Sequence, residues 1–231
     1  MPAETDRHLV IARLREEIRR IERSPARREG RVPCGLVGVD AALPGGGFAR
    51  GAISELSGGP ASGKTAVALA LVASLGPEEL AAYVDGRGEL YPPAAAARGV
   101  DLARLLVVRP PVPRPDGAAS SADAARPGLW AAEALLASGA FGAVVVDVPV
   151  PARLPGADAV ARRLQAAAER GGAVGLWLAP RRAPCEHDGG TGLRLTAAVR
   201  LDIVDEGRRI VARARAVAGP PRRGGGETRV A

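Results

Sequence analysis

Lysine is almost absent from this chain, because all of its 32 basic residues except Lys64 are arginine. Aromatic residues are also scarce, at 3% of the sequence, so the core must be built mainly from aliphatic side chains. No uncharged apolar run reaches the roughly 18–20 residues that a membrane-spanning helix needs, and the N-terminus is charged where a signal peptide is apolar. We therefore expect a cytoplasmic, globular protein with no membrane association.

The chain also lacks the residue clusters that hold transition metals or form disulfide frameworks. Its two cysteines, Cys34 and Cys185, lie far apart in the sequence and form no CxxC pair. The two histidines, His8 and His187, are isolated and have no clustered carboxylates beside them. The sequence therefore predicts two ordinary thiols and no zinc site.

The net charge of +7 is concentrated at the two ends of the chain. Residues 1–31 carry nine arginines against six acids, and residues 208–231 carry seven arginines against Glu227 alone. Arginine-rich ends suit contact with the phosphates of DNA, because each neutralised phosphate releases counterions. The alternative is that both ends are solvated tails whose arginine content reflects codon bias.

A length of 231 residues fits one domain with terminal extensions. Residues 6–23 place apolar side chains at spacings of three and four, which predicts an amphipathic helix. The prolines and arginines of residues 24–35 then indicate a linker. We expect three parts: an N-terminal amphipathic helix and basic linker over 1–35, a domain over 36–217, and a disordered basic tail over 218–231.

Apolar, strand-like runs alternate with helical stretches through the expected domain. Strands are predicted at 52–56, 80–84, 104–108, 142–147 and 173–178, and helices at 64–75, 92–98, 129–138 and 157–170. This alternation predicts an α/β fold with a mainly parallel sheet flanked by helices. The runs 196–204 and 209–217 predict an antiparallel C-terminal hairpin. The segment 109–127, rich in Pro, Ser and Asp, is expected to be an exposed insertion.

The strongest motif is a G-x-x-x-x-G-K-[ST] pattern that follows one predicted strand and opens a predicted helix, the context that a P-loop requires. Glycines let backbone N–H groups surround a β-phosphate, Lys64 neutralises the β- and γ-phosphate oxygens, and the Thr65 hydroxyl binds Mg²⁺. The pattern therefore predicts binding of ATP and Mg²⁺. Its residues are Gly58, Gly59, Pro60, Ala61, Ser62, Gly63, Lys64 and Thr65.

A second acidic element of the predicted site is Asp147, which ends the apolar run 141–147. In P-loop proteins a carboxylate at the end of such a strand holds Mg²⁺ directly or through water, so Asp147 is the expected Walker B residue. The alternative is an aspartate that only caps the loop after the strand.

Around these motifs, over about residues 36–217, the chain resembles the RecA family. The segment 43–55, which reads LPGGGFARGAISE, is similar to the part of RecA that leads into the P-loop. Residues 83–85 and 99–101 are similar to its next strand and helix, and residues 189–190 with 199–203 to the close of its second DNA-binding loop and the strand after it. The resemblance implies the RecA fold.

Within the RecA family the chain looks most like the ImuA branch, also described as SulA-like, which consists of small accessory proteins of damage-induced translesion synthesis. The resemblance rests on the short N-terminal helix, the run LPGGG at 43–47, the small size and the absence of a RecA-type C-terminal domain. The intact P-loop departs from the degenerate one expected in that branch.

Departures from RecA at catalytic positions imply weak or absent ATP hydrolysis. Arg87 stands where RecA has its catalytic glutamate, and an arginine cannot accept a proton from the attacking water. Glu89 is the nearest carboxylate, but it is out of register. Ala179 and Pro180 stand where RecA has the glutamine that links nucleotide to DNA, and both DNA-binding loops are short.

Arg213 and Arg215 fall where RecA places two lysines that reach the nucleotide of a neighbouring subunit, which implies a contact between subunits. In an extended strand both arginines lie on one face. A solvent-facing, charged edge strand is the alternative.

We expect a RecA-like ATP-binding accessory protein of DNA repair, with ATP as an assembly switch and little hydrolysis. Expected partners are RecA or a translesion polymerase, DNA through the basic ends, and further copies of the chain. One alternative is an active DNA-dependent ATPase or recombinase that forms filaments and uses Glu89. The other is a nucleotide-independent adaptor that binds RecA or a polymerase through the helix 6–23.

Overall fold

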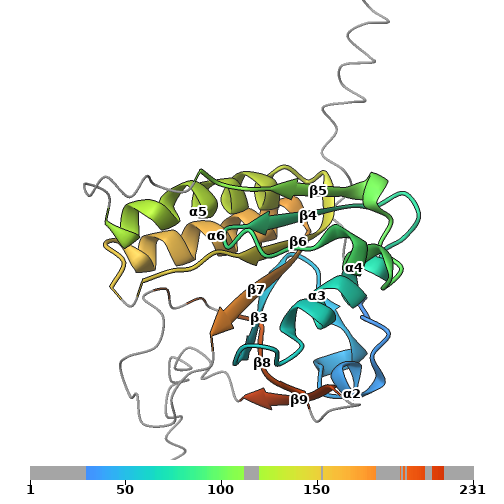
Figure 1. Cartoon of the computed structure of the whole chain (residues 1–231). Coiled ribbons are helices and arrows are strands. Elements are labelled where there is room, and N and C mark those ends of the chain that lie inside the picture. Colours follow the sequence, from blue (N-terminus) through green and yellow to red (C-terminus); the bar gives the residue numbers. More distant parts are fainter. Residues whose placement is uncertain are drawn as a thin grey trace, which may run out of the picture.

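The apolar runs expected as strands form one seven-stranded sheet in a computed structural model of the chain (Figure 1). The structure describes residues 30–111, 120–151, 153–180, 193, 195, 197–205 and 210–215. In their order across the sheet, the strands are β5 (Leu105–Val108), β4 (Leu80–Asp85), β6 (Phe141–Asp147), β7 (Val174–Pro180), β3 (Ala52–Gly58), β8 (Val199–Asp205) and β9 (Ile210–Arg215). All neighbours are parallel except β8 and β9, which pair antiparallel. The predicted α/β fold with its antiparallel C-terminal hairpin is confirmed.

The register of the parallel strands brings four chain segments together at one edge of the sheet. Gly58 at the end of β3 lies opposite Pro180 at the end of β7. Asp85 at the end of β4 lies opposite Asp147 at the end of β6. Because β6 also pairs with β7, these carboxyl ends form one continuous edge. In parallel α/β sheets this is the edge at which ligands bind.

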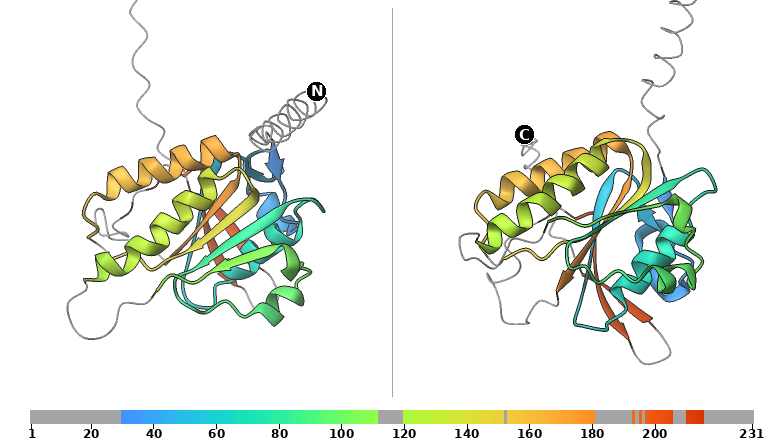
Figure 2. Two further views of the ribbon diagram at one scale, coloured as in Figure 1. Left: turned by 90° about the horizontal axis from the view of Figure 1, so that it is seen from above. Right: turned by 45° about the horizontal axis from the view of Figure 1, so that its top comes forward.

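Helices cover both faces of the sheet (Figures 1 and 2). Helices α5 and α6 pack side by side on one face, and the helices nearer the N-terminus lie on the other. The helices are α2 (Val37–Asp40), α3 (Lys64–Ala73), α4 (Pro92–Ala96), α5 (Ser121–Ala137) and α6 (Ala157–Gly171), with short 3₁₀ turns at Pro44–Gly46 and Leu102–Arg104. A short antiparallel pair, β1 (Arg31–Val32) and β2 (Phe48–Ala49), lies beside the main sheet.

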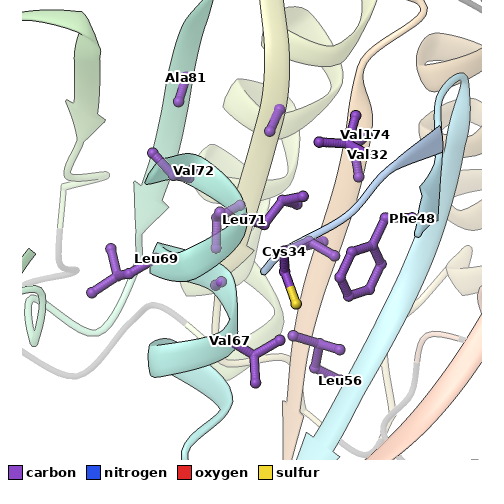
Figure 3. Close-up of a cluster of buried hydrophobic side chains, with 14 of the residues drawn as sticks. Val32, Cys34, Phe48, Leu56, Val67, Leu69, Leu71, Val72, Ala81 and Val174 are labelled. Carbon is purple, nitrogen blue, oxygen red and sulfur yellow. The ribbon is translucent and has the colours of Figure 1, made fainter. Parts of the chain in front are cut away.

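Each face of the sheet has its own buried core of mainly aliphatic side chains, as the scarcity of aromatic residues predicts. On the α3 face, Val67 and Leu71 pack with Leu56 of β3 and Phe48 of β2 (Figure 3). Phe48 and Leu56 are fully buried there. Helix α3 is therefore apolar on most sides, which fixes its first turn, and the P-loop before it, against the sheet.

The segment before β2 contains a short helix, α2, that the sequence does not predict. The last residue of this helix, Asp40, forms hydrogen bonds with the buried Cys34 and its neighbour. The Asp40 carboxylate accepts hydrogen bonds from the backbone N–H groups of Cys34 and Gly35, both at 2.9 Å. The Cys34 thiol also donates to Asp40, with 3.1 Å from Sγ to Oδ1. Burial raises the pKa of the Cys34 thiol to about 12, so this cysteine is an inert core residue.

Helix α5 begins earlier than expected. Residues 109–127 are expected from the sequence to be an exposed insertion, but the helix begins at Ser121 and includes Pro127. Ser120 and Asp123 form a capping box, in which the side chain of each accepts a hydrogen bond from the backbone N–H of the other at 3.2 Å. Ser and Asp are residues of helix N-termini as well as of loops, and here they cap a helix. The prediction is wrong for the part of the segment that lies in α5.

Two predicted elements lie outside the described residues, the amphipathic helix at 6–23 and the basic tail at 218–231. The boundaries proposed for the three parts of the chain therefore stay predictions. Within the described ranges, no helix is long and apolar enough to cross a membrane. The same residues contain no group of three or more His, Cys, Asp or Glu side chains that could hold a metal ion.

The contact between the ends of α5 and α6 predicts a measurable effect on stability. A Cβ added at Gly171 would overlap the carbonyl oxygen of Leu136 and lie 3.1 Å from the Gly139 nitrogen. Because both neighbours are backbone atoms, the helices must separate to accept it. We expect Gly171→Ala to lower the free energy of unfolding by about 2–3 kcal/mol in urea denaturation.

A matched control for this variant is Gly76→Ala, whose added Cβ meets only the Glu79 side chain, at 3.4 Å. We expect it to change the free energy of unfolding by less than about 1 kcal/mol. Equal losses in the two variants would contradict the close packing of α5 against α6.

Candidate nucleotide-binding site

The P-loop connects the end of β3 to the first turn of α3 and depends on small residues at fixed places. Gly58 cannot carry a side chain, because a Cβ there would contact the Ser62 hydroxyl and lie 2.7 Å from the carbonyl oxygen of Ile203. Gly63, the residue before α3, has a φ of 90°, which favours glycine. Ala61 has a φ of 55°, so it too is held in a left-handed conformation. The loop is thus folded back tightly over the helix N-terminus.

Lys64 lies inside this loop. Its Nζ donates a hydrogen bond of 2.6 Å to the carbonyl oxygen of Gly58 at the start of the loop. Burial lowers the pKa of the Lys64 ammonium, and the nearby Asp147 carboxylate acts in the opposite direction. Lys64 is the first residue of α3, so its positive charge lies near the helix N-terminus. The helix dipole and the free backbone N–H groups there favour an anion, as the ammonium does.

A cavity of about 710 Å³ lies over the loop, within the range typical of small-molecule sites. Its walls combine the P-loop with side chains from five other chain segments. The lining residues are Gly58, Gly59, Pro60, Ala61, Ser62, Gly63, Lys64, Thr65 and Ala66, and opposite them Arg87, Glu89, Arg98, Asp147, Leu178, Pro180 and Ile210. The cavity therefore brings together all of the predicted P-loop residues, Asp147 and Glu89.

Asp147 stands at the end of β6 and is mostly buried. The Tyr83 hydroxyl donates to its Oδ2 at 3.3 Å, and Arg87 Nε donates to its Oδ1 at 2.8 Å. Burial raises the pKa of the Asp147 carboxyl, and the hydrogen bond and charge of Arg87 lower it in part. Both carboxylate oxygens thus have a donor, one of which is a full positive charge.

The loop that carries Arg87 and Glu89 is held by Asp85, which is fully buried at the end of β4. Its carboxylate accepts the backbone N–H groups of Glu89 at 3.0 Å and Leu90 at 3.2 Å. Arg109, which follows β5, adds an ion pair of 3.1 Å to the same carboxylate. From the sequence, Asp85 is expected only as part of a strand similar to that of RecA, although a carboxylate at a strand end before a tight loop is a typical acceptor for loop N–H groups.

The other predicted residues lie in different settings. Ala179 is buried in β7, and Pro180, which follows it, lines the cavity without a side-chain hydrogen-bonding group. Arg213 lies on β9 opposite Asp202 of β8, and Arg215 is two residues further along the same strand. Arg213 is not among the described residues that line the cavity. A contact of Arg213 and Arg215 with another subunit therefore stays a prediction.

Three features of the site are missing from the sequence analysis. Arg98, just after α4, adds a further cation to the cavity wall. Ile210 at the start of β9 packs beside Gly63, because a Cβ on Gly63 would lie 3.1 Å from Ile210 Cδ1. Tyr83 contacts Asp147 from the neighbouring strand. No sequence motif identifies these residues, because they lie at the cavity only as a result of the order of the strands in the sheet.

A strand, a glycine-rich loop and a helix N-terminus that share one cavity with an acidic strand end define the class of P-loop nucleotide-binding domains. Residues 14–162 match the RecA N-terminal domain family, and the chain belongs to that family. Membership of this family implies that the domain binds a nucleotide.

Two curated relatives give the extent of the similarity. Protein RecA of Levilactobacillus brevis is 41% identical over 128 residues, which are 55% of this chain and 30% of that protein. Protein RecA of Clostridioides difficile is 38% identical over 128 residues, which are 55% of this chain and 33% of that protein. Because the match spans only about a third of either relative, the activity of the whole RecA protein does not follow from the similarity.

Proposed function

We propose that this protein binds ATP in the cavity over the P-loop and uses the bound nucleotide as an assembly switch in DNA repair, with little hydrolysis. One observation carries the proposal. The phosphate-binding half of the cavity is complete, with Lys64 at the N-terminus of α3, while Arg87 occupies the wall where hydrolysis needs a base. Binding energy alone can shift an equilibrium between two conformations, so a switch does not need rapid turnover.

Triphosphate binding agrees with the charge distribution of the cavity. Lys64, Arg87 and Arg98 supply three cations, and Asp147 and Glu89 supply two carboxylates. Backbone N–H groups at the start of α3 are without helical partners in this position and can donate to phosphate oxygens. The P-loop end of the cavity is thus suited to an anion.

Of the oxygen ligands that Mg²⁺ prefers, the cavity offers the Thr65 hydroxyl and the Asp147 carboxylate. When bound, Mg²⁺ would neutralise charge on the β- and γ-phosphates. Thr65 lies at the exposed side of the loop, and Asp147 faces the same cavity. Asp147, however, already pairs with Arg87.

The site lacks a general base for ATP hydrolysis at the positions where RecA has its catalytic groups. A base must take a proton from water beside the γ-phosphate, and neither Arg87 nor Pro180 carries a group that can do so. Glu89 is the one carboxylate besides Asp147 among the described residues that line the cavity. The alternative function, a DNA-dependent ATPase that assembles into filaments, therefore depends on Glu89.

Within the RecA family we place the chain in the ImuA branch, as an accessory factor of translesion synthesis. The short connection from β6 to α6, residues 148–156, supports this placement, because RecA has its first DNA-binding loop there. RecA or a translesion polymerase, and further copies of the chain through Arg213 and Arg215, are the proposed partners. Direct contact with DNA is proposed for the basic ends.

The role of the basic ends predicts a strong dependence of DNA binding on salt. We expect the logarithm of the affinity for single-stranded DNA to fall by about 0.7 per decade of salt for each phosphate contacted. Deleting residues 219–231, which contain three arginines, should reduce that slope. Fluorescence anisotropy of a labelled oligonucleotide over a salt series, with ATP or ADP present, measures both effects.

The matched control keeps the tail length and replaces Arg222, Arg223 and Arg229 by Gln, which should reduce the slope as much as the deletion does. Binding should also be tighter with ATP than with ADP if the nucleotide acts as a switch. An unchanged slope in both variants would remove the tail from the proposed DNA contacts, and equal binding with ATP and ADP would contradict the switch.

A further inference from the structure

Arg87 lies where a divalent cation would act in a P-loop site. Its Nε donates to Asp147 Oδ1 at 2.8 Å, and Tyr83 occupies the other oxygen. The Asp147 side chain is 11% exposed and that of Arg87 is 35% exposed, so the pair is shielded on the carboxylate side and open towards the cavity. A metal ion bound directly to Oδ1 would compete with the guanidinium, and one bound through water would lie close to this positive charge.

Displacement is unfavourable for two reasons. A guanidinium keeps its charge at every physiological pH, and a hydrogen-bonded ion pair with a mostly buried carboxylate is costly to break. Mg²⁺ loses its bound water reluctantly and requires near-octahedral geometry. In a carboxylate whose two oxygens already have donors, an ion with these demands is at a disadvantage.

The rest of the guanidinium is available to a ligand. Within the described part of the chain, Arg87 uses only Nε in hydrogen bonds, so its two Nη atoms keep their donors. Lys64 and Arg87 both line the cavity, so a ligand bound there lies between the two cations or beside both of them. A planar guanidinium is well suited to phosphate oxygens, because it donates two parallel hydrogen bonds.

We propose that the Arg87 guanidinium takes the place of the divalent cation at Asp147 and contacts the nucleotide phosphates, so that ATP binding depends little on Mg²⁺. This inference rests on the proposed binding of ATP to the cavity. Arg87 thus has two effects: it cannot act as the base for hydrolysis, and it binds the nucleotide phosphates. Asp147 serves to orient Arg87 rather than to hold a metal ion in the nucleotide-free protein.

The test compares ATP affinity in excess Mg²⁺ with that in a chelator, by isothermal titration calorimetry on the full chain. We expect removal of Mg²⁺ to weaken binding by about threefold at most in the wild type, and on the order of ten- to hundredfold in Arg87→Gln, in which Asp147 is open to the ion. Mg²⁺ alone should raise the melting temperature of Arg87→Gln but not that of the wild type.

Arg98→Gln is the matched control, because it removes the same charge from the same cavity without touching Asp147. It should weaken ATP binding equally with and without Mg²⁺, and so keep the wild-type ratio. If the wild type depends on Mg²⁺ as strongly as Arg87→Gln does, the inference is wrong while ATP binding stands. Absence of ATP binding to the wild type under both conditions would contradict the proposed function itself.

Discussion

Lys64→Ala is expected to weaken ATP binding by about a hundredfold or more, while the fold stays intact. The loss follows from removing a charged donor that lies at the N-terminus of α3 in the partly buried P-loop, where charge-assisted hydrogen bonds to phosphate are strong. Titration calorimetry with ATP measures the effect. The fold should survive because the only hydrogen bond of the Lys64 side chain in the described residues is to Gly58.

Lys64→Arg is a useful companion variant, because it keeps the charge but changes the shape of the donor. The bulkier guanidinium does not fit the tight contact with Gly58, so we expect an affinity between those of the wild type and Lys64→Ala. Circular dichroism and melting temperature should match the wild type in both variants. Unchanged ATP affinity in Lys64→Ala would contradict the assignment of the P-loop.

The second large effect concerns turnover. We expect ATP hydrolysis by the wild type to be slower by about 10²–10⁴ than that of a RecA protein under the same conditions, because a general base contributes a factor of that size. Arg87 cannot act as a base, because a guanidinium accepts no proton from water, and its Nε is bonded to Asp147. Phosphate release, measured with and without single-stranded DNA, gives the rate.

Glu89→Gln distinguishes this account from the ATPase alternative. Glu89 lines the cavity, and its backbone N–H is fixed by Asp85. If Glu89 is not a base, the slow rate should be the same in the variant. A wild-type rate equal to that of RecA, stimulated by DNA and lost in Glu89→Gln, would show that the active carboxylate has moved two residues along the chain.

The sequence predicts the fold well because its signals are local and repeated. Strands such as β4 and β6 are short, nearly continuous apolar runs, and α6 shows the periodicity of an amphipathic helix. The P-loop is also a local signal, since strand, loop and helix are contiguous in the chain. Alternation then leaves few arrangements other than a parallel sheet with helices on both faces.

The rest of the site depends on contacts between distant segments, which no local pattern contains. Arg87 and Asp147 are sixty residues apart, and their ion pair exists only because β4 and β6 are neighbours with Asp85 opposite Asp147. Sequence reasoning identified Arg87 by what it cannot do, namely accept a proton. The bond between Arg87 and Asp147 could be predicted only once the strand order was known. The same holds for the position of Arg98 in the cavity wall.

The error at the start of α5 has a different origin. Ser120 and Asp123 are typical of loops, but they are equally typical of helix N-termini, and Pro127 lies inside the helix that they begin. The capping box decides between these alternatives, and it consists of two hydrogen bonds that composition alone does not predict. A Ser-x-x-Asp pattern before an apolar run is the signal that could have found it.

The most direct test of the account is the chemical state of nucleotide retained by the protein. Wild-type protein is mixed with radiolabelled ATP, free nucleotide is removed, and the bound fraction is analysed over many times the turnover time of RecA. We predict that the wild type retains ATP as the triphosphate and that Lys64→Ala retains none. Recovery of ADP alone from the wild type, or of no nucleotide at all, would contradict the claim that this domain binds ATP and hydrolyses it slowly.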